Sequence, residues 1–203
     1  MYAFGDSFTY GLLASDPSTT AYVPLLAAKL GVGVVNKGFP GATMAGVPPS
    51  QPSILAQMLG VPPLLRGDVG VTILGVNEID YSESKQLEFS ALLTQGLLWL
   101  TSRRRVLEPK NEVERRILDR DKLPTVADGG SMFVGNCPTA SPYQARIADA
   151  VAAAAGQGRR VYLIDVQAAW DKASHSPDGI HPDDVGHMQI YGAFYAAMVA
   201  ATI

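Results

Sequence analysis

The chain has 203 residues, of which 47% are hydrophobic and 17% are charged, and its net charge is −3. This length and composition are typical of one globular domain covering residues 1–203, and they exclude a disordered chain. The longest basic run is three arginines at 103–105. Because phosphate binding needs an extended positive surface, the composition argues against nucleic acid as a partner.

No apolar run reaches the length of a membrane span, and the first residues lack the basic region of a signal peptide. We therefore expect no membrane span, and either a cytoplasmic protein or the mature or excised domain of a secreted or virion-associated one. Cys137 is the only cysteine, which excludes an intrachain disulfide and favours a small buried hydrophobic residue.

Five short apolar runs predict buried strands, and stretches with helical spacing lie between them. In chain order the expected elements are strand 2–4, helix 21–30, strand 32–35, helix 53–59, strand 69–74, helix 83–100, strand 132–134, helix 141–155, strand 161–164 and helix 183–201. This alternation predicts an α/β fold with a mostly parallel sheet and helices on both faces.

The most charged stretch of the chain lies between the third and fourth expected strands, at about residues 102–130. We expect a charged helical extension there, with a solvated helix around 111–120. Two interpretations stay open for this extension: an ordinary surface face, or a flap that binds a partner or substrate.

Polar residues follow the strands at one edge of the expected sheet. Ser7 follows the first strand, the glycine-rich turn "NKGFPGAT" (36–43) follows the second, and Asn77 follows the third. Asp178 and His181 lie beyond the fifth strand. Because ligands of open parallel sheets bind beyond the carboxyl ends of the strands, we expect these residues to meet in one site.

These residue types suit nucleophilic catalysis on an acyl group. A serine hydroxyl becomes reactive when an imidazole accepts its proton, and the imidazole needs an acid to orient it. Ser7, His181 and Asp178 supply these three roles. The charge that develops on the carbonyl oxygen needs fixed donors, which the N–H groups of Ser7 and Gly41 and the amide of Asn77 can supply.

Four blocks of sequence resemble the GDSL, or SGNH, hydrolase superfamily of esterases and lipases. They are "FGDSFTYG", "NKGFPGAT", "LGVNE" and "DGIHPDDVGH", which run from residue 4 to residue 187 in the family's order. The resemblance implies a three-layer α/β/α sandwich with a five-stranded parallel sheet, which is a flavodoxin-like arrangement. It also implies that no cofactor is needed.

Carried over block by block, the resemblance implies a nucleophile at Ser7, oxyanion donors at Gly41 and Asn77, an acid at Asp178 and a base at His181. Two features depart from the family pattern. The chain has Glu78 where the family usually has an aspartate that is taken as structural. The segment between Asn77 and the fourth strand is also longer than the family minimum.

Each of these residues has a plainer interpretation. Ser7 taken alone is typical of a helix N-cap, and Asp6 of a turn or cap residue. Gly41 can be an ordinary turn glycine, with Gly38 as its rival for the oxyanion role. Asn77 can simply close a turn. The four blocks together favour the catalytic interpretation over the structural one.

Three histidines, His175, His181 and His187, lie near several acids and raise the alternative of a metal site. The HExxH spacing of zinc enzymes is absent, and His187 is expected well inside the last helix, turned away from His181. We therefore expect no bound metal and a structural role for His187. The sequence also has no phosphate-binding glycine motif of the P-loop or dinucleotide type.

The motifs predict a serine esterase that forms an acyl-enzyme on a small-molecule or glycan ester. A short acyl group, particularly acetyl on a carbohydrate, is favoured because no long hydrophobic lid or acyl tunnel is evident. A lipase, lysophospholipase or thioesterase of the same family is the alternative. A catalytically silent carbohydrate-binding domain on this fold is the other class of function, and retention of all the triad and oxyanion residues argues against it.

Overall fold

The computed structural model describes residues 1–46, 53–102, 129–138 and 141–201. In these residues five parallel strands form one sheet in the order β2-β1-β3-β4-β5. The strands are β1 (Tyr2–Gly5), β2 (Val35–Asn36), β3 (Val69–Ile73), β4 (Ser131–Gly135) and β5 (Val161–Ile164). The first strand of the chain, β1, is thus interior to the sheet, with β2 at one edge.

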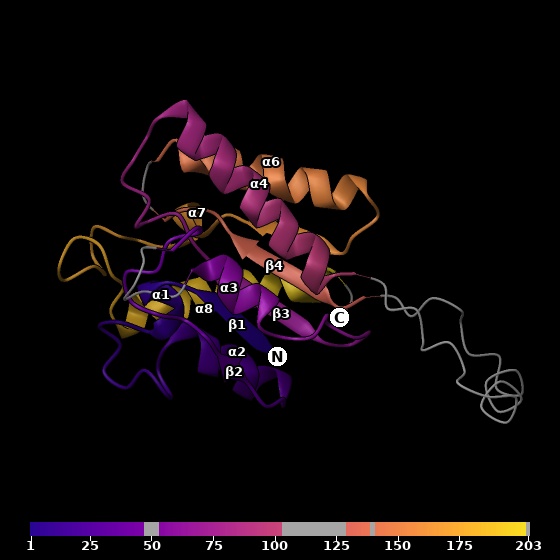
Figure 1. The fold of residues 1–203 in the computed structure, drawn as a ribbon. Helices are drawn as coiled ribbons and strands as arrows, with labels where there is room; N and C mark the ends of the chain where they lie inside the picture. The colour runs from indigo at the N-terminus through magenta and orange to yellow at the C-terminus, as the bar shows by residue number, and fades with distance from the viewer. Residues whose placement is uncertain (47–52, 103–128, 139–140, 202–203) are drawn as a thin grey trace, which may run out of the picture.

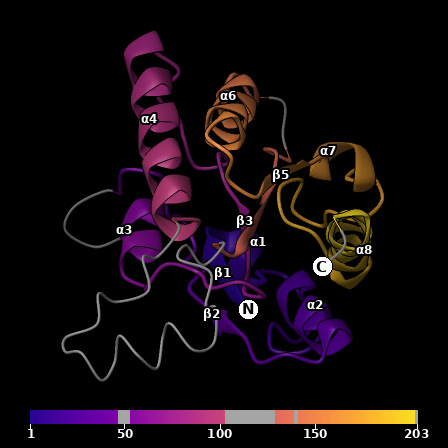
Figure 2. The ribbon, with the colours of Figure 1, turned by 90° about the vertical axis from the view of Figure 1, so that its right-hand side faces the viewer.

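Helices cover both faces of the sheet and make three layers (Figures 1 and 2). One layer contains α3 (Ile54–Leu59), α4 (Glu83–Leu100) and α6 (Tyr143–Gly156). The other contains α2 (Tyr22–Leu30), α7 (Val166–Ala169) and α8 (Asp184–Ala200), and the single turn α1 (Ser7–Tyr10) follows β1 directly. The expected α/β/α sandwich with a five-stranded parallel sheet is confirmed.

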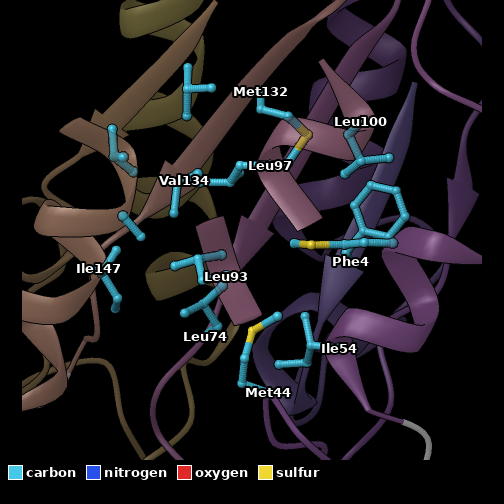
Figure 3. Packing of buried hydrophobic residues seen from close by; sticks show 14 of the residues in the cluster. Phe4, Met44, Ile54, Leu74, Leu93, Leu97, Leu100, Met132, Val134 and Ile147 are labelled. Carbon is cyan, nitrogen blue, oxygen red and sulfur yellow. The ribbon is translucent and has the colours of Figure 1, made fainter. Parts of the chain in front are cut away.

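The core has two halves because successive side chains of a strand point to opposite faces of the sheet. On β4, Met132 and Val134 pack among residues of α3, α4 and α6, whereas Phe133 packs among residues of α2, α7 and α8. Figure 3 shows the first half, in which Phe4, Ile54, Leu93, Leu97, Met132, Val134 and Ile147 converge.

The strand expected at 32–35 is the one clear error among the strands. Pairing is confined to Val35–Asn36, and Val32 and Val35 are exposed by 45% and 44%. Gly31 ends α2 in the left-handed conformation, and the N–H of Val32 bonds to the oxygen of Ala27. Residue 32 therefore completes a helix cap, and the short strand that follows is an uncovered edge.

The expected helix at 111–120 and nearly all of the charged extension at 102–130 lie outside the described residues. In the part of the chain that is described, no helix combines the length and the apolar character needed to cross a membrane.

Candidate active site

Ser7 is the first residue of α1 and comes directly after the turn that ends β1. Asp6 caps this helix, because its Oδ1 accepts a hydrogen bond from the backbone N–H of Phe8 at 3.0 Å. The interpretation of Ser7 as the N-cap is therefore wrong, and the cap role expected for Asp6 is confirmed. The hydroxyl of Ser7 is left available for another partner.

That partner is His181, which joins Ser7 to Asp178 in an unbroken chain of hydrogen bonds. Oγ of Ser7 lies 2.9 Å from Nε2 of His181, and Nδ1 of His181 lies 2.7 Å from Oδ2 of Asp178. Because an ionised carboxylate can only accept, Nδ1 carries a proton and Nε2 is left to accept the proton of Ser7. This is the geometry of a nucleophile, a general base and an orienting acid.

Asp178 is held in its charged form by the loop that it belongs to. Its burial acts to raise the pKa, but hydrogen bonds from the side chain and backbone of His181 and from the backbone of Ile180 outweigh that effect. They lower the pKa of Asp178 to about 2. The carboxylate is thus ionised at neutral pH and can stabilise a protonated His181.

The ring of His181 lies against the buried ring of Phe8, which in turn packs on Trp170. The ring of Phe8 lies 5.6 Å from that of His181, and it meets the edge of Trp170 at 5.6 Å and 79°. Phe8 is fully buried, and Trp170 is only 4% exposed. Because Phe8 is also the residue next to Ser7, the single turn α1 carries both Ser7 and the aromatic ring that contacts His181.

Gly41 and Asn77 lie on neighbouring loops beside the carboxyl end of β1. The strands β1 and β3 are adjacent, with Gly5 paired to Ile73, so the chains that leave them run close together. Nδ2 of Asn77 donates to the backbone oxygen of Ala42 at 3.0 Å. Since this amide nitrogen carries two hydrogens, one is left for a ligand.

The rival glycine, Gly38, already has a partner for its backbone N–H. That group donates to Oδ1 of Asn36 at 2.9 Å, while Nδ2 of Asn36 donates to the oxygen of Thr9 at 2.8 Å. A Cβ on Gly38 would come within 2.4 Å of the Tyr10 nitrogen, so this glycine serves close packing against α1. The geometry favours Gly41 as the oxyanion donor.

Glu78 ties the loop after β3 to the loop that carries Gly41. Its Oε1 accepts a hydrogen bond from the backbone N–H of Met44 at 2.5 Å. Burial raises the pKa of Glu78, although this hydrogen bond partly opposes the shift. The glutamate that replaces the family's usual aspartate therefore has a structural contact of its own, two residues beyond Ala42.

A cavity of about 430 Å³ opens beside the residues expected to bind the oxyanion. Gly41 and Asn77 line it, whereas Ser7, His181 and Asp178 do not. Its apolar wall includes Met44, Phe89, Leu92 and Tyr143, and its charged side chains are Glu78, Asp80, Lys85 and Glu88. The cavity thus adjoins the part of the expected site that carries Gly41 and Asn77.

The histidines do not gather into a metal site. Among residues 1–46, 53–102, 129–138 and 141–201, no group of three or more metal-binding side chains is present. His175 faces Asp183, with Nδ1 3.3 Å from Oδ2, and is therefore separate from the pair of His181 and Asp178. His187 is fully buried in α8, where its ring stacks on Tyr22 at 6.3 Å.

The sequence did not predict the residues that support the site, notably Phe8, Trp170 and Gln57. Gln57 lies in α3 and is only 8% exposed, yet its carboxamide bonds to the backbone of Gly5, 52 residues away. The only sequence feature that points to a buried Gln57 is its position in a helix beside the apolar residues Ile54 and Met58. Such a residue is buried only if its amide has partners.

Several solved carbohydrate esterases share this fold. A family two carbohydrate esterase from Clostridium thermocellum, in complex with cellohexaose, gives a TM-score of 0.66 at 16% identity, covering 99% of this chain and 63% of that chain. A second match is a carbohydrate esterase family 2 enzyme with a carbohydrate binding domain, from Corynascus thermopiles. It gives a TM-score of 0.63 at 18% identity, and the match covers 99% of this chain and 65% of that chain. The chain therefore spans less than two thirds of either protein.

A Clostridium thermocellum family 3 carbohydrate esterase is closer in length. It gives a TM-score of 0.55 at 19% identity, and the match covers 98% of this chain and 94% of that chain. No curated protein sequence matches the chain. The family model described as GDSL-like Lipase/Acylhydrolase matches residues 3–189, and the chain therefore belongs to this family of carboxylic ester hydrolases.

Proposed function

We propose that the protein is a serine esterase that hydrolyses carboxylic esters through an acyl-enzyme on Ser7. The observation that carries this proposal is the chain of hydrogen bonds from Ser7 Oγ through the imidazole of His181 to Asp178, at 2.9 and 2.7 Å. A silent carbohydrate-binding domain would not need this alignment. Nor would it need a carboxylate whose pKa is lowered to about 2 beside the imidazole.

In the first half of the reaction, Ser7 Oγ attacks the ester carbonyl carbon while Nε2 of His181 takes its proton. The N–H groups of Ser7 and Gly41 and one hydrogen of the Asn77 amide receive the developing oxyanion. Asp178 stabilises the imidazolium, which then gives its proton to the leaving alcohol. In the second half, water attacks the acyl-enzyme by the same steps and frees Ser7.

The favoured substrate is a short acyl ester, in particular an acetyl group on a carbohydrate. Two exposed aromatic residues belong to segments that adjoin the turn before Ser7. Tyr10, three residues after Ser7 in α1, is 46% exposed, and Phe39, whose N–H bonds to the oxygen of Gly5, is 40% exposed. Exposed aromatic rings suit the flat apolar faces of sugars. The carbohydrate esterases that share the fold support the same choice.

A longer acyl group, as in a lipase, lysophospholipase or thioesterase substrate, is the second candidate. The cavity of about 430 Å³ favours it, since the volume exceeds that of an acetyl group and the wall includes Met44, Phe89 and Leu92. The leaving alcohol must lie near His181 to receive its proton, so the side of the ester that faces this cavity is the acyl side.

Initial rates on p-nitrophenyl esters from acetate to palmitate, for the wild type and Ser7→Ala, test the proposal. We expect hydrolysis that is fastest on acetate and absent from a folded Ser7→Ala protein. An optimum at long chains would favour the lipase alternative. Equal rates for both proteins on these esters and on acetylated glycans would overturn the esterase proposal.

A further inference from the structure

The side chain of Gln57 pairs with both backbone groups of Gly5. Its Oε1 accepts from the N–H of Gly5 at 2.8 Å, and its Nε2 donates to the oxygen of Gly5 at 3.0 Å. Both bonds are buried. Gly5 is the last residue of β1, and the chain turns from it through Asp6 to Ser7. The carboxamide of Gln57 thus forms, at the end of β1, the pair of hydrogen bonds that a peptide group of a neighbouring strand would form.

The edge strand β2 is too short to supply these bonds. Alternate residues of a strand direct their N–H and C=O groups to the same side, and those of Met1, Ala3 and Gly5 face β2. Strand pairing ends at Ala3 and Asn36. Phe39 still donates to the oxygen of Gly5 at 3.1 Å, but the N–H of Gly5 finds its acceptor in Gln57. Without that side chain, a buried N–H would lose its partner.

The turn at Gly5 is closely packed on its other sides. Gly5 has a φ of 143°, and a Cβ there would come within 2.4 Å of Thr9 Oγ1 and 2.5 Å of the Ile73 oxygen. Ser7 follows two residues later, whereas its base, His181, comes from a distant loop. The distance between nucleophile and base therefore depends on where this turn is held.

We propose that Gln57 is a positioning residue, which holds the backbone of Gly5 so that the hydroxyl of Ser7 meets His181. This inference rests on the proposed esterase function. Gln57 does not touch the substrate. It acts through the peptide groups of Gly5 and so sets the rate of attack rather than substrate binding.

Gln57→Leu is the direct test, because leucine has a similar size and no polar group. We expect kcat to fall about 10- to 100-fold with KM nearly unchanged, which is the order of loss for a reacting group misplaced by up to 1 Å. The matched control is Ser53→Ala. Ser53 Oγ caps α3 by accepting from the Ala56 N–H at 2.8 Å, so its loss weakens the same helix without touching Gly5.

Gln57→Glu adds a readout that a purely structural role would not change. A protonated carboxyl group can donate to the oxygen of Gly5 and accept from its N–H, whereas a carboxylate cannot donate. The ratio of the variant's kcat to the wild-type kcat should therefore fall as pH rises through the titration of the introduced group. Asp6 follows Gly5, and Glu78 acts on the pKa of Asp6 through its charge. Both acids are present in both proteins, so the ratio isolates position 57.

The inference is overturned if folded Gln57→Leu keeps the wild-type kcat, or loses no more activity than Ser53→Ala at equal loss of stability. A ratio for Gln57→Glu that is constant with pH contradicts it as well. If the wild type hydrolyses no ester faster than Ser7→Ala, the proposed function itself has failed. In that case the hydrogen-exchange rate of the Gly5 amide tests whether Gln57 holds this backbone. Faster exchange in Gln57→Leu but not in Ser53→Ala supports the inference, and equal exchange rates in the two variants overturn it.

Discussion

The side-chain amide of Asn77 donates a hydrogen bond to the backbone oxygen of Ala42 at 3.0 Å, which joins the loop after β3 to the residue next to Gly41. One hydrogen of Nδ2 is held by this bond, so the direction of the other is fixed before any substrate arrives. Fixed donors cost no reorganisation during the reaction and are effective for that reason. Asn77 thus holds the two loops together and, in the proposed mechanism, also offers a donor to the oxyanion.

Replacing Asn77 with alanine should lower kcat by roughly 10²–10³, the loss typical of one oxyanion donor. Steady-state kinetics on the best ester measure this effect. Asn136→Ala is the matched control, since Asn136 follows β4 and its amide donates to Oδ1 of Asp165 at 2.7 Å, outside the proposed oxyanion site. A folded Asn77→Ala protein with the kcat of the control would remove Asn77 from the oxyanion site.

Asp178→Asn should lower kcat by about 10⁴, because an amide in place of the carboxylate favours the wrong tautomer of His181 and no longer stabilises its charged form. The comparison is Asp183→Asn, which alters the other pair of an acid and a histidine in this region, Asp183 with His175. Asparagine can still cap α8 there. Similar kcat values for the two variants would show that Asp178 has no special role.

Two buried groups, Asp6 and His187, should make the free energy of unfolding depend on pH in opposite directions. Burial raises the pKa of Asp6 to about 7, and its Oδ2 has no hydrogen-bond partner among the described residues. Burial lowers the pKa of His187 to about 4. From about pH 4 to 7, folded Asp6 keeps a proton that the unfolded chain releases, so stability falls as pH rises. From about pH 4 to 6.5, unfolded His187 holds a proton that the folded protein lacks, so stability rises with pH.

Single substitutions should separate these opposing effects. Asp6→Asn keeps an oxygen to cap Phe8 and removes the titration, so its stability should increase between pH 4.5 and 6.5. At pH 8 it should exceed the wild type by up to about 4 kcal/mol, the value of three pKa units. His187→Phe keeps an aromatic ring against Tyr22, and its stability should decrease over the same interval. Urea denaturation at several pH values measures the stability of the wild type and of both variants. If stability changes with pH in the same way in all three proteins, the opposing effects assigned to Asp6 and His187 are contradicted.

The order of strands and helices could be predicted because each buried strand is a short apolar run and the stretches between them have helical spacing. Gly31 and Gly60 also mark the ends of α2 and α3. The helix expected at 83–100 matches α4, even though Gly96, a poor helix former, lies inside it. In the structure a Cβ at Gly96 would come within 2.5 Å of Met58 Sδ, so the glycine allows α4 to approach α3. The short helices α1 and α7 could not be predicted, since four residues carry no periodic pattern.

The residues proposed to react could be predicted because each follows a strand or lies in a recognisable block, and parallel strands bring such positions to one edge. The residues that hold them in place could not be predicted. Phe8 under His181, Gln57 on Gly5 and Glu78 on Met44 are contacts between segments far apart in the chain. Nothing in the local sequence marks a buried glutamine as a partner for one particular peptide group.

The most direct test of the central claim is to trap the nucleophile. The protein and its His181→Ala variant are treated with diisopropyl fluorophosphate, and the labelled residue is located by peptide mass spectrometry while residual esterase activity is followed. We expect a single label on Ser7 that forms in step with loss of activity, and much slower labelling of His181→Ala. A label on another residue, or full esterase activity in protein labelled at Ser7, would contradict it.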